Sequence, residues 1–375
     1  MNTQQIFINN NKYKSCHSVT LCKMKNGDLL AAWFAGDEEG SKNSVILTSR
    51  REKNKHGWLP ASVTVNVVDR AAGNPRVFNG PDGGVWLLAP INYGKWCQGG
   101  TRLFVKRSYD YGRSWSDLEL FVEPKGILGK NKPICTKADT WIVPCEYEER
   151  WQAVFLRLPE GRKEWEIIEC PETNARLHQP TIIQKENGDL LAFMRTWEGV
   201  LYQTQSSDDG VTWTKPAATG IPNNNSGIDM VNLNGTNIAL ICNPCSLGKD
   251  GTIIVTSENR PDKIDIKELC EADSRQIINI IDPESSSAIL SPSFPVWGPR
   301  SPLSILLSND EGETWCLVAD IETGPGEYSY PAVIQSAERQ ISIAYTANRK
   351  EIRYVEFEIP DSFVGKKYSR YVNTK

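Results

Sequence analysis

The stretch Ser206-Ser207-Asp208-Asp209-Gly210-Val211-Thr212-Trp213 decides the fold, because its pattern S-x-D-x-G-x-T/S-W occurs three times in the chain. The other copies run from Ser108 to Trp115 and from Ser308 to Trp315. In each copy the Asp side chain can accept hydrogen bonds from backbone amides two residues on, and Gly supplies a positive φ. The Trp ring then packs beneath the neighbouring strands. Three such matches predict a repeated β-hairpin.

A second repeat, a turn followed by an apolar strand, lies between these hairpins. Its copies begin near positions 27, 83, 139, 188, 235 and 339. The mean step of about 50 residues is typical of a four-stranded propeller blade. The one long gap, from 235 to 339, is two steps wide, so the fifth blade is expected to carry an insertion at about 246–299.

The last repeat contains three strand-like runs, at 332–335, 341–346 and 351–358, and therefore lacks a fourth strand. The early run 5–8 can supply it and cover both sheet edges. The sequence thus predicts an all-β chain, a six-bladed β-propeller of four-stranded antiparallel blades in a single domain over residues 1–375. Little helix is expected, because no stretch sustains a helical apolar period.

Composition limits the partners that we expect. The 375 residues carry a net charge of −4, which argues against a nucleic-acid or membrane surface, so local arginines would have to hold an anionic ligand. The N-terminus lacks the apolar core of a secretory signal. Together with ten scattered cysteines, this favours a cytoplasmic protein with reduced thiols. The acidic and histidine residues do not cluster at ligand spacings, so no metal or other cofactor is expected.

With these repeats the chain resembles the sialidase (neuraminidase) superfamily, whose members are six-bladed propellers with Asp-box, or BNR, repeats. The resemblance covers nearly the whole chain apart from 246–299. It implies a site where three arginines hold a substrate carboxylate, a tyrosine acts as nucleophile, a glutamate activates it, and an aspartate is the acid/base. Arg195 and Arg300 match two of the arginines, and Tyr328 matches the nucleophile.

Three positions depart from the pattern that the resemblance implies. His17 stands where the first-blade arginine is expected, and Gln179 stands where the activating glutamate is expected. The acid/base belongs in a loop where Asp37 and Glu39 stand. Because an amide cannot take a proton from Tyr328 at neutral pH, the retaining hydrolysis mechanism is placed in question.

The departures also suggest other site residues. His17 and His178 both fall at strand starts, and histidine is suited to proton transfer near neutral pH. Lys132 and Asn74 begin or precede inner strands and could contact a ligand, and Arg349 could be a further site arginine. The last candidate is Asp229, which is either a turn-former or a ligand contact.

These observations lead to one first hypothesis and two alternatives. The first is a sialidase-like carbohydrate-active enzyme that hydrolyses a terminal glycosidic bond of an acidic sugar. The second is a polysaccharide lyase that cleaves a uronate-containing glycan by β-elimination, with a His base and a Tyr acid. The third is a non-catalytic glycan-binding propeller. In each case the expected ligand is an acidic sugar or another carboxylated small molecule.

Overall fold

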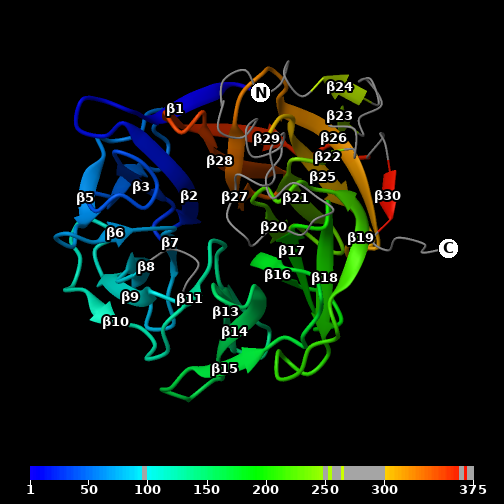
Figure 1. The fold of residues 1–375 in the computed structure, drawn as a ribbon, viewed down its shortest axis with the longest axis horizontal. Coiled ribbons are helices and arrows are strands. Elements are labelled where there is room, and N and C mark those ends of the chain that lie inside the picture. Colours follow the sequence, from blue (N-terminus) through cyan, green and yellow to red (C-terminus); the bar gives the residue numbers. More distant parts are fainter. Residues whose placement is uncertain (95–98, 248–251, 256–262, 266–299, 363–366, 370–375) are drawn as a thin grey trace. The chain divides into compact units, whose positions relative to one another are not determined.

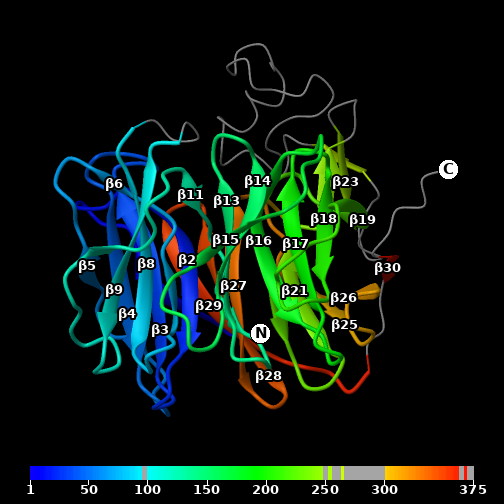
Figure 2. The ribbon, with the colours of Figure 1, turned by 90° about the horizontal axis from the view of Figure 1, so that it is seen from below.

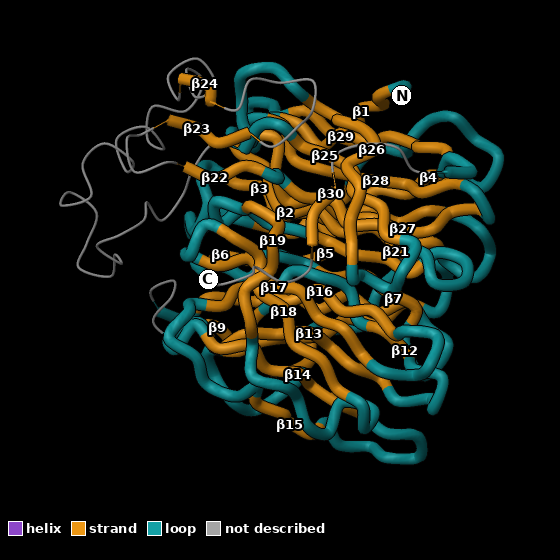
Figure 3. The backbone as a smooth tube through the Cα atoms, turned by 90° about the vertical axis from the view of Figure 1, so that its right-hand side faces the viewer, coloured by secondary structure: helices purple, strands orange, loops and turns teal. Residues whose placement is uncertain are grey.

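The computed structural model describes residues 1–94, 99–247, 252–255, 263–265, 300–362 and 367–369. These described residues form antiparallel sheets joined by loops and contain no helix (Figure 3). The chain divides into two compact units. The first consists of Met1–Glu169 and Tyr330–Glu358, and the second of Cys170–Ser329 and Ile359–Lys375.

The first unit contains four sheets, which are blades 1 to 3 and blade 6. Blade 1 is built from β2 (Ser15–Lys23), β3 (Leu29–Gly36), β4 (Val45–Arg51) and β5 (Ser62–Val65). Blade 2 is built from β6 (Ala71–Ala72), β7 (Arg76–Asn79), β8 (Val85–Asn92), β9 (Thr101–Ser108) and β10 (Glu119–Leu120). Blade 3 is built from β11 (Ile127–Leu128), β12 (Ile134–Cys135), β13 (Trp141–Tyr147), β14 (Gln152–Leu158) and β15 (Glu166–Glu169). Blade 6 is built from β1 (Thr3–Ile8), β27 (Tyr328–Ala337), β28 (Gln340–Ala347) and β29 (Glu351–Glu358).

The second unit contains blades 4 and 5 and begins the first strand of blade 6. Blade 4 is built from β16 (Leu177–Gln184), β17 (Leu190–Thr196), β18 (Val200–Ser206) and β19 (Ala217–Pro222), which lie in this order in Figure 1. Blade 5 is built from β20 (Asp229–Asn232), β21 (Ile238–Cys242), β25 (Leu303–Ser308), β26 (Thr314–Glu322) and β30 (Lys367–Ser369).

A small additional sheet follows β21 in the sequence. It consists of β22 (Cys245–Leu247), β23 (Thr252–Val255) and β24 (Lys263–Asp265). Because β21 pairs directly with β25, the chain from 243 to 302 leaves blade 5 and returns to it. Most of the expected insertion at 246–299 lies outside the described residues.

The N-terminal strand completes the last blade. Strand β1 pairs antiparallel with β29, with Thr3 opposite Val355 and Ile8 opposite Glu351. The sheet order is therefore β1-β29-β28-β27, which gives blade 6 its fourth strand. Six antiparallel sheets of this kind make the chain a six-bladed β-propeller, and both the fold class and the closing strand are confirmed.

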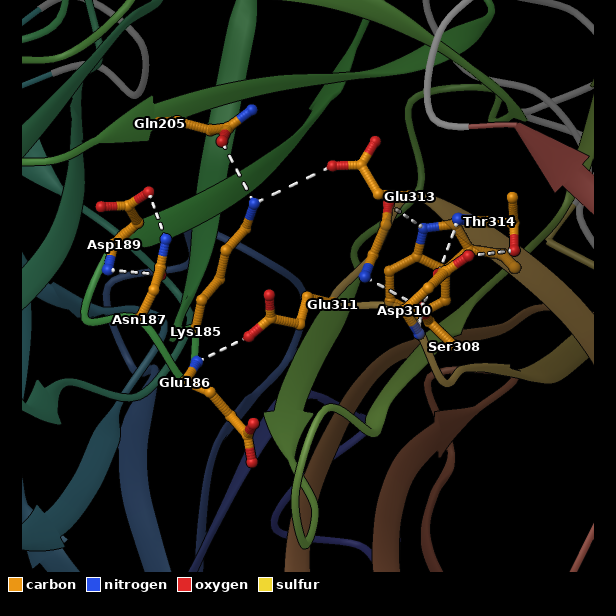
Figure 4. Close-up of polar contacts among 12 residues, drawn as sticks. Lys185, Glu186, Asn187, Asp189, Gln205, Ser308, Asp310, Glu311, Glu313 and Thr314 are labelled. Carbon is orange, nitrogen blue, oxygen red and sulfur yellow. Dashed lines mark hydrogen bonds and ion pairs between the residues drawn. The ribbon is translucent and has the colours of Figure 1, made fainter.

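The Asp boxes form the predicted tight turns, with one correction to their hydrogen bonds. In the third copy the carboxylate of Asp310 accepts from the Thr314 amide at 2.9 Å and from its hydroxyl at 2.6 Å, four residues on (Figure 4). Ser308 Oγ donates to Asp310 and accepts from the Gly312 amide, both at 2.8 Å. The expected reach of two residues was wrong because Ser308, and not the aspartate, caps the middle of the turn. Gly312 has φ +86°, as predicted.

The box of blade 5 also joins its blade to blade 4. Trp315 is 1% exposed and packs against Phe193 of β17, with ring centroids 5.6 Å apart. A Cβ on Gly312 would lie 2.8 Å from a methyl carbon of Leu191, so a larger residue would have to displace Leu191 and adopt a strained positive φ. Figure 4 shows the nearby turn of blade 4, where the Glu186 amide donates to the Glu311 carboxylate at 2.6 Å. Each large side chain buried here contributes about 1.5–3 kcal/mol.

Bulges interrupt the first strands of blades 1 and 4 near their starts. The register of β2 against β3 shifts between His17 and Thr20, and that of β16 against β17 shifts between His178 and Thr181. The residues after the two histidines, Ser18 and Gln179, have φ values of 57° and 45°. In β27, Tyr330 has φ 52°. A bulge bends a strand and redirects its side chains, and such features often occur beside functional sites. Figure 2 shows these strands along their length.

Candidate functional site

A buried ion pair lies at the start of β25 and β27 in the second unit. Arg300 Nη1 contacts Glu327 Oε1 at 2.6 Å, and each side chain is 4% exposed. Ser329 Oγ accepts from Arg300 Nη1 at 3.3 Å and donates to Glu327 Oε1 at 3.0 Å. The three groups hold one another in a fixed orientation, since a guanidinium and a carboxylate pair best in one plane.

In the sequence, Tyr328 lies between Glu327 and Ser329, the two residues that contact Arg300. Its amide donates to the Arg300 carbonyl at 2.9 Å, and its carbonyl accepts from Asn243 Nδ2 at 3.0 Å. The side chain is 8% exposed. Its hydroxyl lies near the turn before the strand, where a Cβ on Gly324 would be 3.9 Å from it.

A buried loop of three asparagines and a serine, Asn223 to Ser226, connects the arginines of blades 4 and 5. The Asn225 carbonyl accepts from Arg195 Nη1 at 3.1 Å. At the other end, Ser226 Oγ donates to Asn243, whose Nδ2 donates to Tyr328 as described above. All four loop residues are at most 2% exposed, and Asn225 has φ 64°. Through these hydrogen bonds the loop links the Arg195 guanidinium to the Tyr328 carbonyl.

The histidine and glutamine of β16 lie in the same unit. His178 Nε2 accepts a hydrogen bond from Trp197 Nε1 at 2.8 Å, and the two rings are nearly parallel, with an interplanar angle of 10°. The guanidinium of Arg176 lies over the Trp197 ring, with its Cζ 4.3 Å from the ring centroid. One ring nitrogen of His178 is thus engaged in a hydrogen bond within the core. Gln179 is 3% exposed at the bulge.

Asp229, the first residue of β20, has a structural contact. Its Oδ1 accepts from Thr181 Oγ1 at 2.9 Å, and the same hydroxyl accepts from the Met230 amide at 2.9 Å. The carboxylate is 2% exposed and joins β16 to β20. The geometry gives Asp229 a structural role, in which its side chain joins blade 4 to blade 5.

In the first unit, His17 lies against two aromatic rings. It is fully buried, 4.1 Å from the Tyr330 ring and 5.8 Å from the Phe34 ring between centroids. The ammonium of Lys130 lies 5.9 Å from the Tyr330 centroid and donates to the Pro331 carbonyl. A histidine, a tyrosine and a cation therefore meet in this unit, and sequence analysis had not singled out Tyr330 or Lys130.

The two acidic candidates of the first unit form ion pairs in loops. Asp37 contacts Lys14 Nζ at 3.0 Å, and this hydrogen bond, with a second from Asn43, lowers the pKa of the Asp37 carboxyl. Glu39 contacts Arg349 Nη1 at 2.5 Å. Both carboxylates are close to half-exposed. Two further candidates, Asn74 and Lys132, are half-buried.

The second unit therefore brings together Arg195, Arg300 and Tyr328, the three residues that matched the superfamily. Glu327 and the loop from Asn223 were missed. The signals for them were an acidic residue directly before the predicted tyrosine and three consecutive asparagines before a strand. Arginine side chains in such an arrangement can bind a carboxylate, and the phenol of Tyr328 follows the ion-paired Glu327 directly in the sequence.

Two searches give negative results for the described part of the chain. There, no group of three or more His, Cys, Asp or Glu side chains is placed to hold a metal ion. The same residues include no helix of the length and apolarity that a membrane span needs.

The sheets and Asp boxes define the class of the protein as a BNR-repeat propeller, and comparison with solved structures agrees. A leech intramolecular trans-sialidase has a TM-score of 0.69 at 12% identity, over 96% of this chain and 70% of that one. The intramolecular trans-sialidase of Ruminococcus gnavus has a TM-score of 0.65 at 14% identity, over 94% and 97%. A protein of unknown function from Dyadobacter fermentans has 0.64 at 13%, over 96% and 99%. At these identities the likeness concerns the fold.

Residues 27–343 match the BNR repeat-like domain, and the chain belongs to that family. No curated protein has a significantly similar sequence. The predicted resemblance to the sialidase superfamily is thus confirmed for the repeats and for the fold.

Proposed function

We propose that the protein is a sialidase-like enzyme that hydrolyses a terminal glycosidic bond of an acidic sugar. The observation that carries the proposal is the buried arrangement of Arg300, Glu327 and Tyr328 in consecutive contact, with Arg195 tied to the same network through the asparagine loop. Structures with the same fold include intramolecular trans-sialidases, which supports the choice of substrate class.

Each residue has a role that follows from its chemistry. Arg195 and Arg300 bind the sugar carboxylate, because a guanidinium offers parallel donors that match its two oxygens. Tyr328 is the nucleophile, since a neutral phenol is not repelled by the carboxylate of the substrate as an anionic nucleophile would be. Glu327 orients Arg300. The position that the superfamily uses for the activating glutamate holds Gln179, so another group must take the phenol proton.

The test is turnover of a fluorogenic sialoside by the wild type and by Tyr328→Phe. Removing the nucleophile is expected to lower kcat about 10³-fold or more. Tyr109→Phe is the matched control, because Tyr109 is 70% exposed and hydrogen-bonds only to Asp82 at the rim of blade 2 among the described residues. A wild type that releases no fluorophore, or a Tyr328→Phe variant as active as Tyr109→Phe, would overturn the proposal.

The second candidate function is β-elimination on a uronate, favoured by one observation in the first unit. His17, Tyr330 and Lys130 meet there, and they supply a base, an acid and a cation. Elimination creates a double bond that absorbs in the ultraviolet. Two results together would establish the lyase in place of the hydrolase. Uronate-containing glycans would give an absorbance rise that His17→Gln abolishes, and the sialoside would release no fluorophore.

A further inference from the structure

Arg76, the first residue of β7, is a fully buried arginine, and only one of its three nitrogens has a partner among the described residues. Its side chain is 0% exposed. Nη1 donates to the Pro144 carbonyl at 2.9 Å and contacts Cys145 Sγ at 3.3 Å. Nε and Nη2 are equally buried, and neither has a hydrogen-bond acceptor among the residues that the structure describes. Nor does any described carboxylate pair with this guanidinium.

Nε and Nη2 form one edge of the Arg76 guanidinium. In a guanidinium, the N–H of Nε and one N–H of Nη2 point the same way and make a two-pronged donor, the geometry that fits the two oxygens of a carboxylate. Burying a charged group is strongly unfavourable unless the charge is paired. An anion on this edge would supply the two missing acceptors and the missing negative charge in a single contact.

The surroundings of Arg76 are shaped to hold it in this pose. A Cβ on Gly129 would lie 3.0 Å from Arg76 Nη1 and 2.6 Å from the Pro144 carbonyl oxygen. Any larger residue would therefore force the guanidinium away from its anchor. The Nη1 edge is fixed by the Pro144 and Cys145 contacts, which leaves the opposite edge in a defined direction.

We infer that Arg76 binds the carboxylate of a small acidic ligand, such as a sugar acid, through Nε and Nη2. The ligand class is a planar monoanion, because the fork offers two coplanar donors and one charge. The inference concerns binding in the first unit and does not depend on the hydrolysis proposed for Tyr328. Because the fork is buried, binding requires local side-chain movement, so association is expected to be slower than diffusion allows.

The experiment follows the Arg76 Nε–H resonance in protein labelled with ¹⁵N-arginine, assigned by its loss in Arg76→Lys. Acetate, glucuronate and N-acetylneuraminate are added in turn, and chloride at equal ionic strength is the control. We expect a saturable shift with at least one carboxylate and none with chloride. Calorimetric titration should show about 10-fold or greater weakening in Arg76→Lys, which keeps the charge and loses the fork.

If Arg76→Lys folds poorly, a second pair of variants tests the same inference. Gly129→Ala should weaken carboxylate binding because it displaces the anchored edge. Gly57→Ala is the matched control, since its Cβ would meet nothing within 4 Å, and it should bind as the wild type does.

The outcomes separate this inference from the hydrolase proposal. An Nε–H shift that persists in Arg300→Ala supports the Arg76 site even if the sialoside is never cleaved. No shift with any carboxylate at millimolar concentration, or an equal shift with chloride, would show that Arg76 is a structural residue only. Carboxylate affinity unchanged in both Arg76→Lys and Gly129→Ala would lead to the same conclusion.

Discussion

Removing the carboxylate of Glu327 should be one of the most damaging single changes in the second unit. Glu327→Ala leaves the Arg300 guanidinium, 4% exposed, without its counter-charge at 2.6 Å. Removing one partner of a buried ion pair costs about 3–5 kcal/mol, because an uncompensated charge stays in the interior. The loss of the Ser329 hydrogen bond at 3.0 Å acts in the same direction.

The measurement is urea-induced unfolding followed by tryptophan fluorescence. Glu169→Ala is the matched control, because Glu169 pairs with Arg150 at 3.0 Å with both side chains nearly half-exposed. An exposed pair contributes about 0–1 kcal/mol, so the two alanine variants should differ by at least about 2 kcal/mol.

A variant that lacks both charges tests the origin of this loss. Arg300→Met combined with Glu327→Leu removes both charges and replaces them with apolar groups, which is often neutral for a buried pair. The double variant should therefore be more stable than Glu327→Ala alone. If Glu327→Ala and Glu169→Ala lose the same stability within about 0.5 kcal/mol, the Arg300–Glu327 pair is not a buried charge pair and the reasoning fails.

The remaining predictions concern pH and thiol reactivity. Partial burial raises the pKa of Asp208, but hydrogen bonds from the Thr212 hydroxyl and amide and from Ser206 outweigh it and lower the pKa to about 2. Since this pKa lies below the ordinary value of 3.8, the contribution of Asp208 to stability is present above about pH 4 and is lost as the pH falls toward 2. Unfolding midpoints of Asp208→Asn should thus depend less on pH in this window than those of the wild type, and equal dependence would contradict the prediction. Cys135 is the exposed cysteine of the described residues, and burial raises the pKa of others such as Cys22, to about 12. Peptide mapping after iodoacetamide treatment of the folded protein should show Cys135 modified far faster than Cys22, and similar rates would refute this burial.

The repeated turns were predictable because their physics is local. A glycine at positive φ and a carboxylate that caps its own turn need no information from distant parts of the chain, so Asp208 and Gly312 were recognised from eight residues each. The closing strand was predictable for a related reason, since a blade with three strands leaves an edge that the run near Ile8 can cover.

The contacts of the candidate residues were not predictable, because they join residues far apart in the sequence. Nothing in the local sequence shows that Arg300 pairs with Glu327, 27 residues later, or that Trp197 uses a nitrogen of His178. The contact of Asp229 could not be predicted from the local sequence either. A carboxylate at a strand start suggested a turn or a ligand contact, and the structure places it on the Thr181 hydroxyl.

Arg300 and Arg76 are both buried, but only Arg300 pairs with a described carboxylate. This difference indicates at which arginine a bound anion gains more interaction free energy. Arg300 already has a carboxylate at 2.6 Å, so a ligand carboxylate there meets a pair of near-zero net charge and gains mainly hydrogen bonds. Arg76 has a carbonyl and a thiol on one edge and no described carboxylate, so an anion there gains both the hydrogen bonds and the full charge. Charge-assisted bonds contribute about 1.5–3 kcal/mol each, and desolvation of the ligand offsets part of that. A carboxylated ligand bound in the first unit should therefore depend on Arg76 for its affinity. Arg300 of the second unit, held rigidly by Glu327, is better suited to orient a carboxylate bound there.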